Sequence, residues 1–253
     1  MNIKVSTQPR KEIKYNPSLV GFGQIVFDDK YVLDKVYILQ RKNGDYAIEL
    51  PSISVKKKDE NGNYVEKKDG NYAKEDLEVF HPITAMARQE LTAAVVHAFR
   101  DSCGEKNVPF TITGEFKPDA SHSRITPYEQ DNQLAFGSVC FGDFVLERVQ
   151  LLKKNDGTGN KYSAPSRPAK IKDKETGEIK EVYRDWFFPI DAQARLDLMN
   201  AIEKAYNNAL IEKADTASAK VSNTMSTSQE QGLSLSSFED VIEAPTQNNR
   251  NKR

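Results

Sequence analysis

Cysteine and tryptophan are scarce in this chain of 253 residues, which contains two cysteines and one tryptophan. Two thiols, Cys103 and Cys140, are too few for a disulfide framework at this length, so they favour a reducing compartment. The two cysteines form no Cys-x-x-Cys pair, and the three histidines form no His-Glu-x-x-His motif. The sequence therefore predicts no zinc site.

Long apolar runs and a net charge are also missing. No run of 18 apolar residues occurs, and residues 1–5 lack the apolar core of a signal peptide. We therefore expect a cytoplasmic protein that does not contact membranes. The 36 Lys and Arg residues nearly balance the 37 Asp and Glu residues, giving a formal net charge of −1. Any nucleic-acid binding must therefore use local clusters of cations.

Motifs for catalysis are absent as well. The sequence contains no Gly-x-Ser-x-Gly elbow, no P-loop and no dinucleotide fingerprint. Gly21 and Gly23 flank Phe22 inside a run of strand-forming residues, which favours a bulge or close packing over a phosphate cradle. We therefore predict that the chain is not an enzyme and has neither catalytic residues nor a cofactor.

What the chain does have is an internal repeat. A pattern of aromatic and aliphatic residues that begins at Phe22 returns from Phe136, and a helical pattern around Arg88 returns around Arg195. The offset falls from 114 residues at the first pair to 107 at the second, and the slips lie in turn-like stretches. A period near a hundred residues indicates two copies of one domain rather than a solenoid.

The repeat sets the expected domain boundaries. We predict a first copy over residues 1–103 and a second over residues 108–212, each of ordinary size for a small domain. The remaining residues, 213–253, are rich in Ala, Ser, Thr, Gln and Asn and cannot bury enough apolar surface to order themselves. We expect a disordered tail, which could serve a protein partner.

Strand-forming runs separated by turn signals dominate the first copy. Leu19–Phe27, Tyr31–Leu39 and Tyr46–Leu50 predict an antiparallel meander, and Ile3–Ser6 predicts a short strand at its edge. The second copy repeats this meander from residue 134, after residues 117–130, which read as an inserted polar loop with two prolines.

Each copy then has a charged excursion, with hairpin tips predicted at Asn61-Gly62 and at Thr176-Gly177, and ends in an amphipathic helix. The fold class is thus α+β, with an antiparallel β-meander sheet and a C-terminal helix in each repeat, followed by the tail. Thr84 and Asp191 read as cap or first-turn residues. The apolar faces are predicted at helical spacing over Ile83, Ala87, Leu91, Ala94, Val95, Ala98 and Phe99, and over Ile190, Ala194, Leu198, Ala201, Ile202, Ala205 and Tyr206.

Four blocks in fixed order point to a known family. They are the strand pair Gln24–Leu39, the strand end at Pro51, the block His81-Pro82-Ile83 and the closing helix, and the second copy repeats all four. In this combination the copies resemble the SpoVG family, the stage V sporulation protein G or septation-protein regulators of bacteria. The resemblance implies small proteins that dimerise and bind DNA and RNA. Phe188 in place of His81, and the longer acidic excursion of copy one, depart from the family pattern.

Two functions of different classes follow. The resemblance implies a regulator that binds DNA or RNA as a single-chain pseudo-dimer in which the two repeats pair with each other. Further association of the chain into homo-oligomers stays possible. The alternative is a non-enzymatic protein-interaction scaffold that uses sheet edges or the tail. Steep salt dependence of binding would identify nucleic acid, because phosphate neutralisation releases counterions.

Clustered cations supply the candidate binding residues. Six cations outnumber the acids of the second excursion, residues 166–187, whereas the first excursion, residues 52–80, is net −1. Arg88 and Arg195 occupy the same position in the two helices, where a phosphate contact and a structural salt bridge are equally open. The aromatics of the excursions could stack bases or pack on their hairpins. The candidate residues are Arg167, Lys170, Lys172, Lys174, Lys180, Arg184, Arg195, Lys56, Lys57, Lys58 and Arg88.

Overall fold

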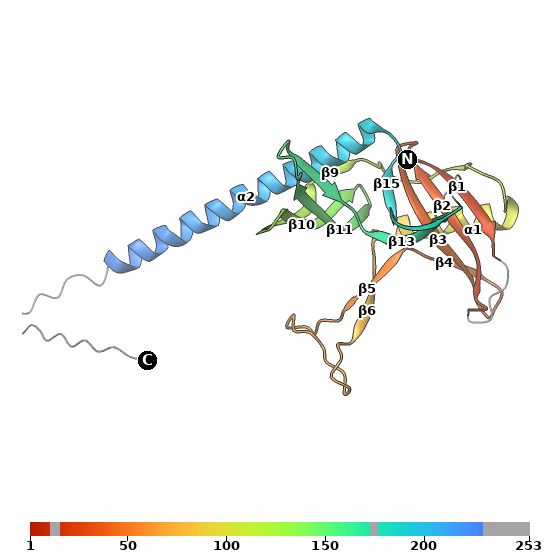
Figure 1. Cartoon of the computed structure of the whole chain (residues 1–253), viewed down its shortest axis with the longest axis horizontal. Coiled ribbons are helices and arrows are strands. Elements are labelled where there is room, and N and C mark those ends of the chain that lie inside the picture. The colour runs from red at the N-terminus through yellow and green to blue at the C-terminus, as the bar shows by residue number, and fades with distance from the viewer. Residues whose placement is uncertain (11–15, 173–176, 230–253) are drawn as a thin grey trace, which may run out of the picture. The chain divides into compact units, whose positions relative to one another are not determined.

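The computed structural model describes residues 1–10, 16–172 and 177–229. These residues form a mixed α+β fold of mostly antiparallel strands with two helices (Figure 1). The chain divides into two units, Met1–Ile211 and Glu212–Arg253. Of the two described helices, neither has a stretch long and apolar enough to cross a bilayer.

The first sheet has six strands in the order β15-β3-β2-β1-β8, with β4 also paired to β3. The predicted meander is confirmed, but β1 is an interior strand rather than an edge, because β8 pairs with its outer side. The chain's amino group supports this pairing by donating to the carbonyl oxygens of Ile112 and Gly114, at 3.0 and 2.7 Å. The strands are β1 Asn2–Pro9, β2 Leu19–Phe27, β3 Tyr31–Gln40, β4 Tyr46–Glu49, β8 Val108–Thr111 and β15 Phe187–Pro189.

The second sheet has the order β12-β11-β10-β9, with β7 also paired to β11. The expected loop over residues 117–130 is wrong, since Pro118–Gln130 is the long strand β9. Its prolines stand where strands tolerate them, because Pro118 is the first residue and Pro127 adjoins a register shift. The other strands are β7 Phe80–Pro82, β10 Gln133–Phe141, β11 Phe144–Lys153 and β12 Asn160–Ser163.

The two sheets exchange their short strands reciprocally. β7 leaves the first half of the chain and pairs with β11, whereas β15 leaves the second half and pairs with β3. The flanking hydrogen bonds also correspond. The Glu147 amide donates to the Val79 carbonyl, and the Asp34 amide donates to the Trp186 carbonyl, each at 2.8 Å. Each sheet is therefore completed by a strand from the other half of the chain.

The exchanged strands bring aromatic rings together in one core. Phe80 of β7 and Phe187 of β15 stack on each other, with ring centroids 5.0 Å apart. Phe80 also stacks on Phe144, and Phe187 stacks on Tyr31, at 5.6 and 5.5 Å. Phe116, between the sheets in sequence, stacks on Phe27 at 4.3 Å. The buried residues of both sheets and both helices consequently form a single hydrophobic cluster.

Each charged excursion begins as a hairpin. β5 Ser52–Lys56 pairs with β6 Lys74–Glu78, and β13 Ser166–Lys172 pairs with β14 Ile179–Asp185 (Figure 1). The first hairpin continues into two turns, at Gly62, as predicted, and at Gly70, both with positive φ. In the second, residues 173–176 lie outside the described residues, so the predicted tip at Thr176 does too.

The helices begin where their caps predict. Thr84 Oγ1 accepts from the Ala87 amide at 3.1 Å before α1 (Ala85–Asp101), and Asp191 Oδ1 accepts from the Ala194 amide at 2.7 Å before α2 (Ala192–Gln229). Most of the predicted apolar faces are buried. Ile83 and Ile190 are corrections, at 54% and 50% exposed. They lie in the turn before each helix, so they are not part of its face.

α2 is longer than predicted. We expected residues after 212 to be disordered, whereas the helix continues to Gln229. Alanine recurs in this stretch and has the highest helix propensity. The hydroxyls of Thr216 and Ser218 also donate to carbonyls four residues earlier, so they do not compete with the helix. Residues 230–253 lie outside the described residues.

Gly137 and Gly23 provide a matched test of how closely the strands pack. A Cβ atom at Gly137 would lie 1.9 Å from the Arg124 carbonyl oxygen, whereas one at Gly23 would lie 3.3 Å from the Ser6 carbonyl oxygen. We expect Gly137→Ala to lower the free energy of unfolding by about 3 kcal/mol, and Gly23→Ala by less than about 1 kcal/mol. Equal losses in chemical denaturation would contradict the register of β9 on β10.

His81 makes the stability of the pairing between β7 and β11 depend on pH. The His81 Nε2 atom lies 3.3 Å from Glu147 Oε1, and this hydrogen bond raises the pKa of His81. This hydrogen bond thus stabilises the folded state fully below the ordinary histidine pKa of about 6.5. The stabilisation is lost as pH rises through the higher pKa that His81 has in the folded state.

The matched variant is His81→Phe, because Phe188 stands at the corresponding position. We expect the wild type's advantage over this variant in unfolding free energy to be larger at pH 6 than at pH 9. The pH-dependent part should stay below about 1 kcal/mol, since the pair is partly solvated. Denaturation at both pH values measures it, and a constant difference would refute the role of the ion pair.

Candidate functional site

The β13–β14 hairpin divides its cations between two faces. Arg167 pairs with Arg184 and Lys170 pairs with Glu181, three positions further along the ladder. The side chain of Lys172 lies outside the described residues. Because side chains alternate along a strand, Arg167, Lys180 and Arg184 belong to one face, and Lys170 belongs to the other. The excursion therefore does not present one continuous row of cations.

Over the ladder positions described for β13 and β14, the first of these faces holds no acidic residue. Arg184 is exposed, and its cross-strand neighbour is another arginine. On the second face, Glu181 stands directly opposite Lys170, and Asp185 stands opposite Ser166. Cross-strand pairs of opposite charge attract, so Lys170 is partly compensated. Lys174 lies outside the described residues.

Arg167 is tied into the fold. Its Nη2 atom donates to Asp34 Oδ2 at 2.9 Å, and its guanidinium lies 5.0 Å from the centre of the Trp186 ring. The side chain of Arg167 is only 20% exposed. This ion pair joins the second excursion to β3, next to the strand exchange. The observed contacts of Arg167 are thus structural.

Aromatic rings hold the cations of the first excursion. Lys56 Nζ lies 4.1 Å from the centre of the Tyr72 ring, and Lys58 Nζ lies 5.3 Å from the Tyr64 ring. The two tyrosine rings meet edge to face at 5.6 Å. Lys57 alternates to the opposite face, and its amide donates to the Ala73 carbonyl. This cluster of two lysines and two tyrosines therefore closes the loops of the excursion and keeps cationic groups at the surface.

The two helical arginines have different surroundings. Arg88 donates to both carboxylate oxygens of Glu78, at 3.1 and 2.6 Å, which is the salt-bridge alternative. Arg195 is exposed in the first turn of α2. Burial raises the pKa of Asp185, and the nearby charge of Arg195 opposes that shift. The corresponding positions therefore do not share one arrangement.

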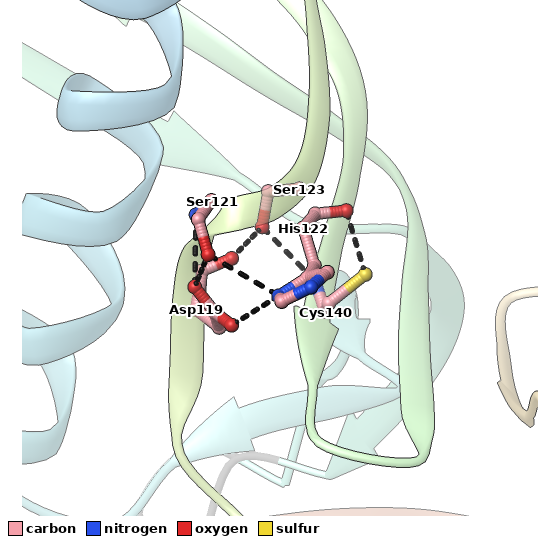
Figure 2. Close-up of polar contacts among 5 residues, drawn as sticks. All are labelled: Asp119, Ser121, His122, Ser123 and Cys140. Carbon is pink, nitrogen blue, oxygen red and sulfur yellow. Dashed lines mark hydrogen bonds and ion pairs between the residues drawn. The ribbon is translucent and has the colours of Figure 1, made fainter.

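A polar cluster at the start of β9 was not predicted. Figure 2 shows Asp119, Ser121, His122 and Ser123 beside Cys140 of β10. His122 Nδ1 lies 2.5 Å from Asp119 Oδ2, and Ser121 Oγ donates to Asp119 Oδ1 at 2.6 Å. These hydrogen bonds, from Ser121 and then His122, hold the pKa of Asp119 well below its usual range.

The geometry of this cluster favours a structural role. Ser121 and Asp119 both contact the same imidazole nitrogen, Nδ1, so no Ser–His–Asp relay through the two ring nitrogens forms. Burial raises the pKa of Cys140, which keeps its thiol protonated and weakly nucleophilic. Ser123 Oγ accepts from the Cys140 amide at 3.0 Å, across the register shift between β9 and β10. The cluster therefore closes a bulge.

The outer face of the second sheet holds a further group of residues that the sequence reasoning missed. Arg124, Phe136 and Arg148 line a cavity of about 520 Å³. Lys35 and Arg148, at corresponding positions, both have positive φ, at 63° and 57°. The recurrence of Phe22 as Phe136 and of Lys35 as Arg148 could have indicated this group of residues. It does not indicate to which face of the sheet their side chains point.

Comparison with protein families finds a match over part of the chain. No curated protein and no solved structure matches the chain. The family model described as SpoVG matches residues 2–101, which include β1 to β7 and α1. The first part of the chain is therefore similar to the SpoVG family, over less than half of its length.

Proposed function

We propose that this protein is a regulator that binds DNA or RNA as a single-chain pseudo-dimer of two SpoVG-like repeats, 1–103 and 108–212. The SpoVG domain of residues 2–101 suggests a regulatory protein associated with sporulation or septation. The proposal adds the second repeat, the pairing and the ligand. It assigns the protein a binding role and no catalytic one.

The reciprocal strand exchange is the observation that carries the pseudo-dimer. β7 completes the second sheet and β15 completes the first, in equivalent registers. The element order β2 to α1 also recurs as β10 to α2. Exchanged elements are a low-cost way to join two copies, and a covalent joint raises the effective concentration of the second copy to about the millimolar range.

The distribution of cations supports the nucleic-acid ligand. The chain has almost no net charge, yet its second excursion presents the exposed Arg184, and its first keeps Lys56 and Lys58 at the surface. Local cation clusters of this kind can neutralise phosphates without a basic protein overall.

A protein-interaction scaffold is the second candidate. Ile179 and Tyr183 on β14 are exposed, at 70% and 76%. Exposed apolar side chains on a hairpin favour contact with a protein partner. Salt dependence separates the two functions, because a scaffold that binds through apolar contacts would show little of it.

The salt dependence of binding tests the ligand and the hairpin face together. We expect the chain to bind random DNA or RNA with a steep log-affinity against log-salt slope. Arg184→Ala should flatten that slope by about 0.7–0.9, and weaken binding similarly for every sequence, because it removes one phosphate contact. Lys170→Ala should have a smaller effect, since Glu181 already compensates its charge.

Electrophoretic shift assays at several salt concentrations, with circular dichroism as a folding control, measure both variants. Binding with no slope in the wild type would favour the scaffold. A larger effect of Lys170→Ala than of Arg184→Ala would show that the opposite hairpin face meets the phosphates.

The mass in solution tests the pseudo-dimer. If the exchange within one chain satisfies the pairing, the protein should run as a monomer of 28.5 kDa in light scattering. A mass of twice that value at micromolar concentration would show that chains pair with each other. The exchanged strands would then pair between two chains rather than within one.

A further inference from the structure

The outer face of the second sheet carries an exposed aromatic pair. Tyr128 of β9 and Phe136 of β10 meet edge to face, with ring centroids 5.6 Å apart, and they are 45% and 43% exposed. The hydroxyl of Tyr128 donates to Gln130, which fixes the direction of its ring. The cross-strand neighbours of Phe136 are Thr126 and Gln150, in the middle of the sheet. Part of each ring therefore faces solvent.

Two arginines flank this pair. Arg124 stands opposite Ser138, one ladder step along the same face from Phe136, and Arg148 lines the same cavity from β11. Within the described residues, neither arginine has a carboxylate at ion-pair distance. The cavity contains one acid, Glu147, which is already 3.3 Å from His81. The face is thus cationic and aromatic together.

Arg148 is held in an unusual backbone conformation. Its φ of 57° lies in the left-handed region, which costs a residue with a side chain of order 1 kcal/mol or more. It stands in the bulge where β11 shifts register against Gly137 and Val139 of β10. Strained positions of this kind cluster at functional sites, because the surrounding fold has to maintain them.

The first sheet carries a closed version of the same arrangement. Phe22 and Lys35 correspond to Phe136 and Arg148, and Lys35 also has positive φ. There the Lys35 ammonium lies 4.4 Å from the centre of the Phe22 ring and covers it. Phe22 is accordingly half-buried, whereas Phe136 is not covered by its own arginine. Only the second sheet leaves its ring available to a ligand.

We propose that Tyr128 and Phe136 form a stacking platform for the unpaired bases of single-stranded DNA or RNA, with Arg124 and Arg148 holding the adjoining phosphates. The proposal rests on the proposed nucleic-acid function. It assigns the binding site to the outer face of the second sheet and the ligand to single-stranded nucleic acid. Aromatic side chains within a cationic groove bind successive bases because every base has a flat face to stack. In a duplex those faces are already stacked, so the platform should discriminate against double strands.

The test compares three variants of the full chain. They are Phe136→Ala with Tyr128→Ala, Arg124→Gln with Arg148→Asn, and Phe22→Ala as the matched control. Asparagine is chosen at position 148 because it tolerates positive φ. Phe22 is the corresponding ring of the first sheet, which Lys35 covers. Labelled oligothymidylate, oligouridylate and a duplex of equal length are titrated in fluorescence anisotropy at several salt concentrations.

The aromatic variant should bind single strands roughly 5- to 150-fold more weakly per base lost from the stack, with its salt slope unchanged. The arginine variant should flatten that slope by about 0.7 for each phosphate contact with a single strand. Duplex binding by the aromatic variant, and all binding by the Phe22→Ala control, should stay near wild type. Circular dichroism and the denaturation midpoint establish that each variant is folded.

Three results would overturn the platform. If the wild type binds single strands and the aromatic variant binds them equally well, the platform is wrong while the proposed function stands. Equal losses for single strands and duplexes would mean that the face contacts phosphates without stacking bases. If the wild type binds none of the three nucleic acids, the proposed function fails and the platform fails with it.

Discussion

The structure depends on the reciprocal exchange of β7 and β15, because neither sheet is complete without a strand from the other half of the chain. The contact of Phe80 with Phe187 joins the two exchanges directly. Offset aromatic pairs contribute about 0.5–1.5 kcal/mol beyond the area that they bury, and several such pairs meet here. The exchange therefore places the largest apolar side chains between the two halves, which explains why residues 1–211 form one compact unit rather than two.

The β-bulges of β3 and β11 connect this exchange to the outer surface. In each bulge an acid precedes a basic residue of positive φ, as Asp34 before Lys35 and Glu147 before Arg148. The amide of each acid donates to the segment that leads into the exchanged strand. The carboxylate of each acid contacts a basic side chain from the other half of the chain, His81 in one case and Arg167 in the other. Lys35 and Arg148, the residues that follow, each line a cavity, so each bulge links one residue of the junction with one residue of a cavity lining.

Local patterns predicted the local structure well, as the boundaries of β2 and the capping of α1 by Thr84 show. The long-range pairing of strands was harder to predict from the sequence. β7 follows the other strands of the first half in the chain, and no local pattern indicates that it pairs with the second sheet. β9 was missed because its residues are polar and its prolines stand at tolerated positions. For the candidate site, the charge composition of the excursions identified the cations. It could not show on which face of a hairpin each cation lies, because a shift of one residue in strand register moves every side chain to the other face.

The differences between the two halves say more about function than their likeness. His81 with Glu147 and Arg167 with Asp34 use different residues at the same junction, so the junction demands an ion pair rather than particular side chains. On the outer faces the divergence has a consequence, because Lys35 covers the ring of Phe22 in the first sheet while Phe136 stays open in the second. Two separate chains of one sequence would have to keep both faces alike. Two sheets within one chain are free of that requirement, and this physical freedom is consistent with the proposed stacking of bases on the second face alone.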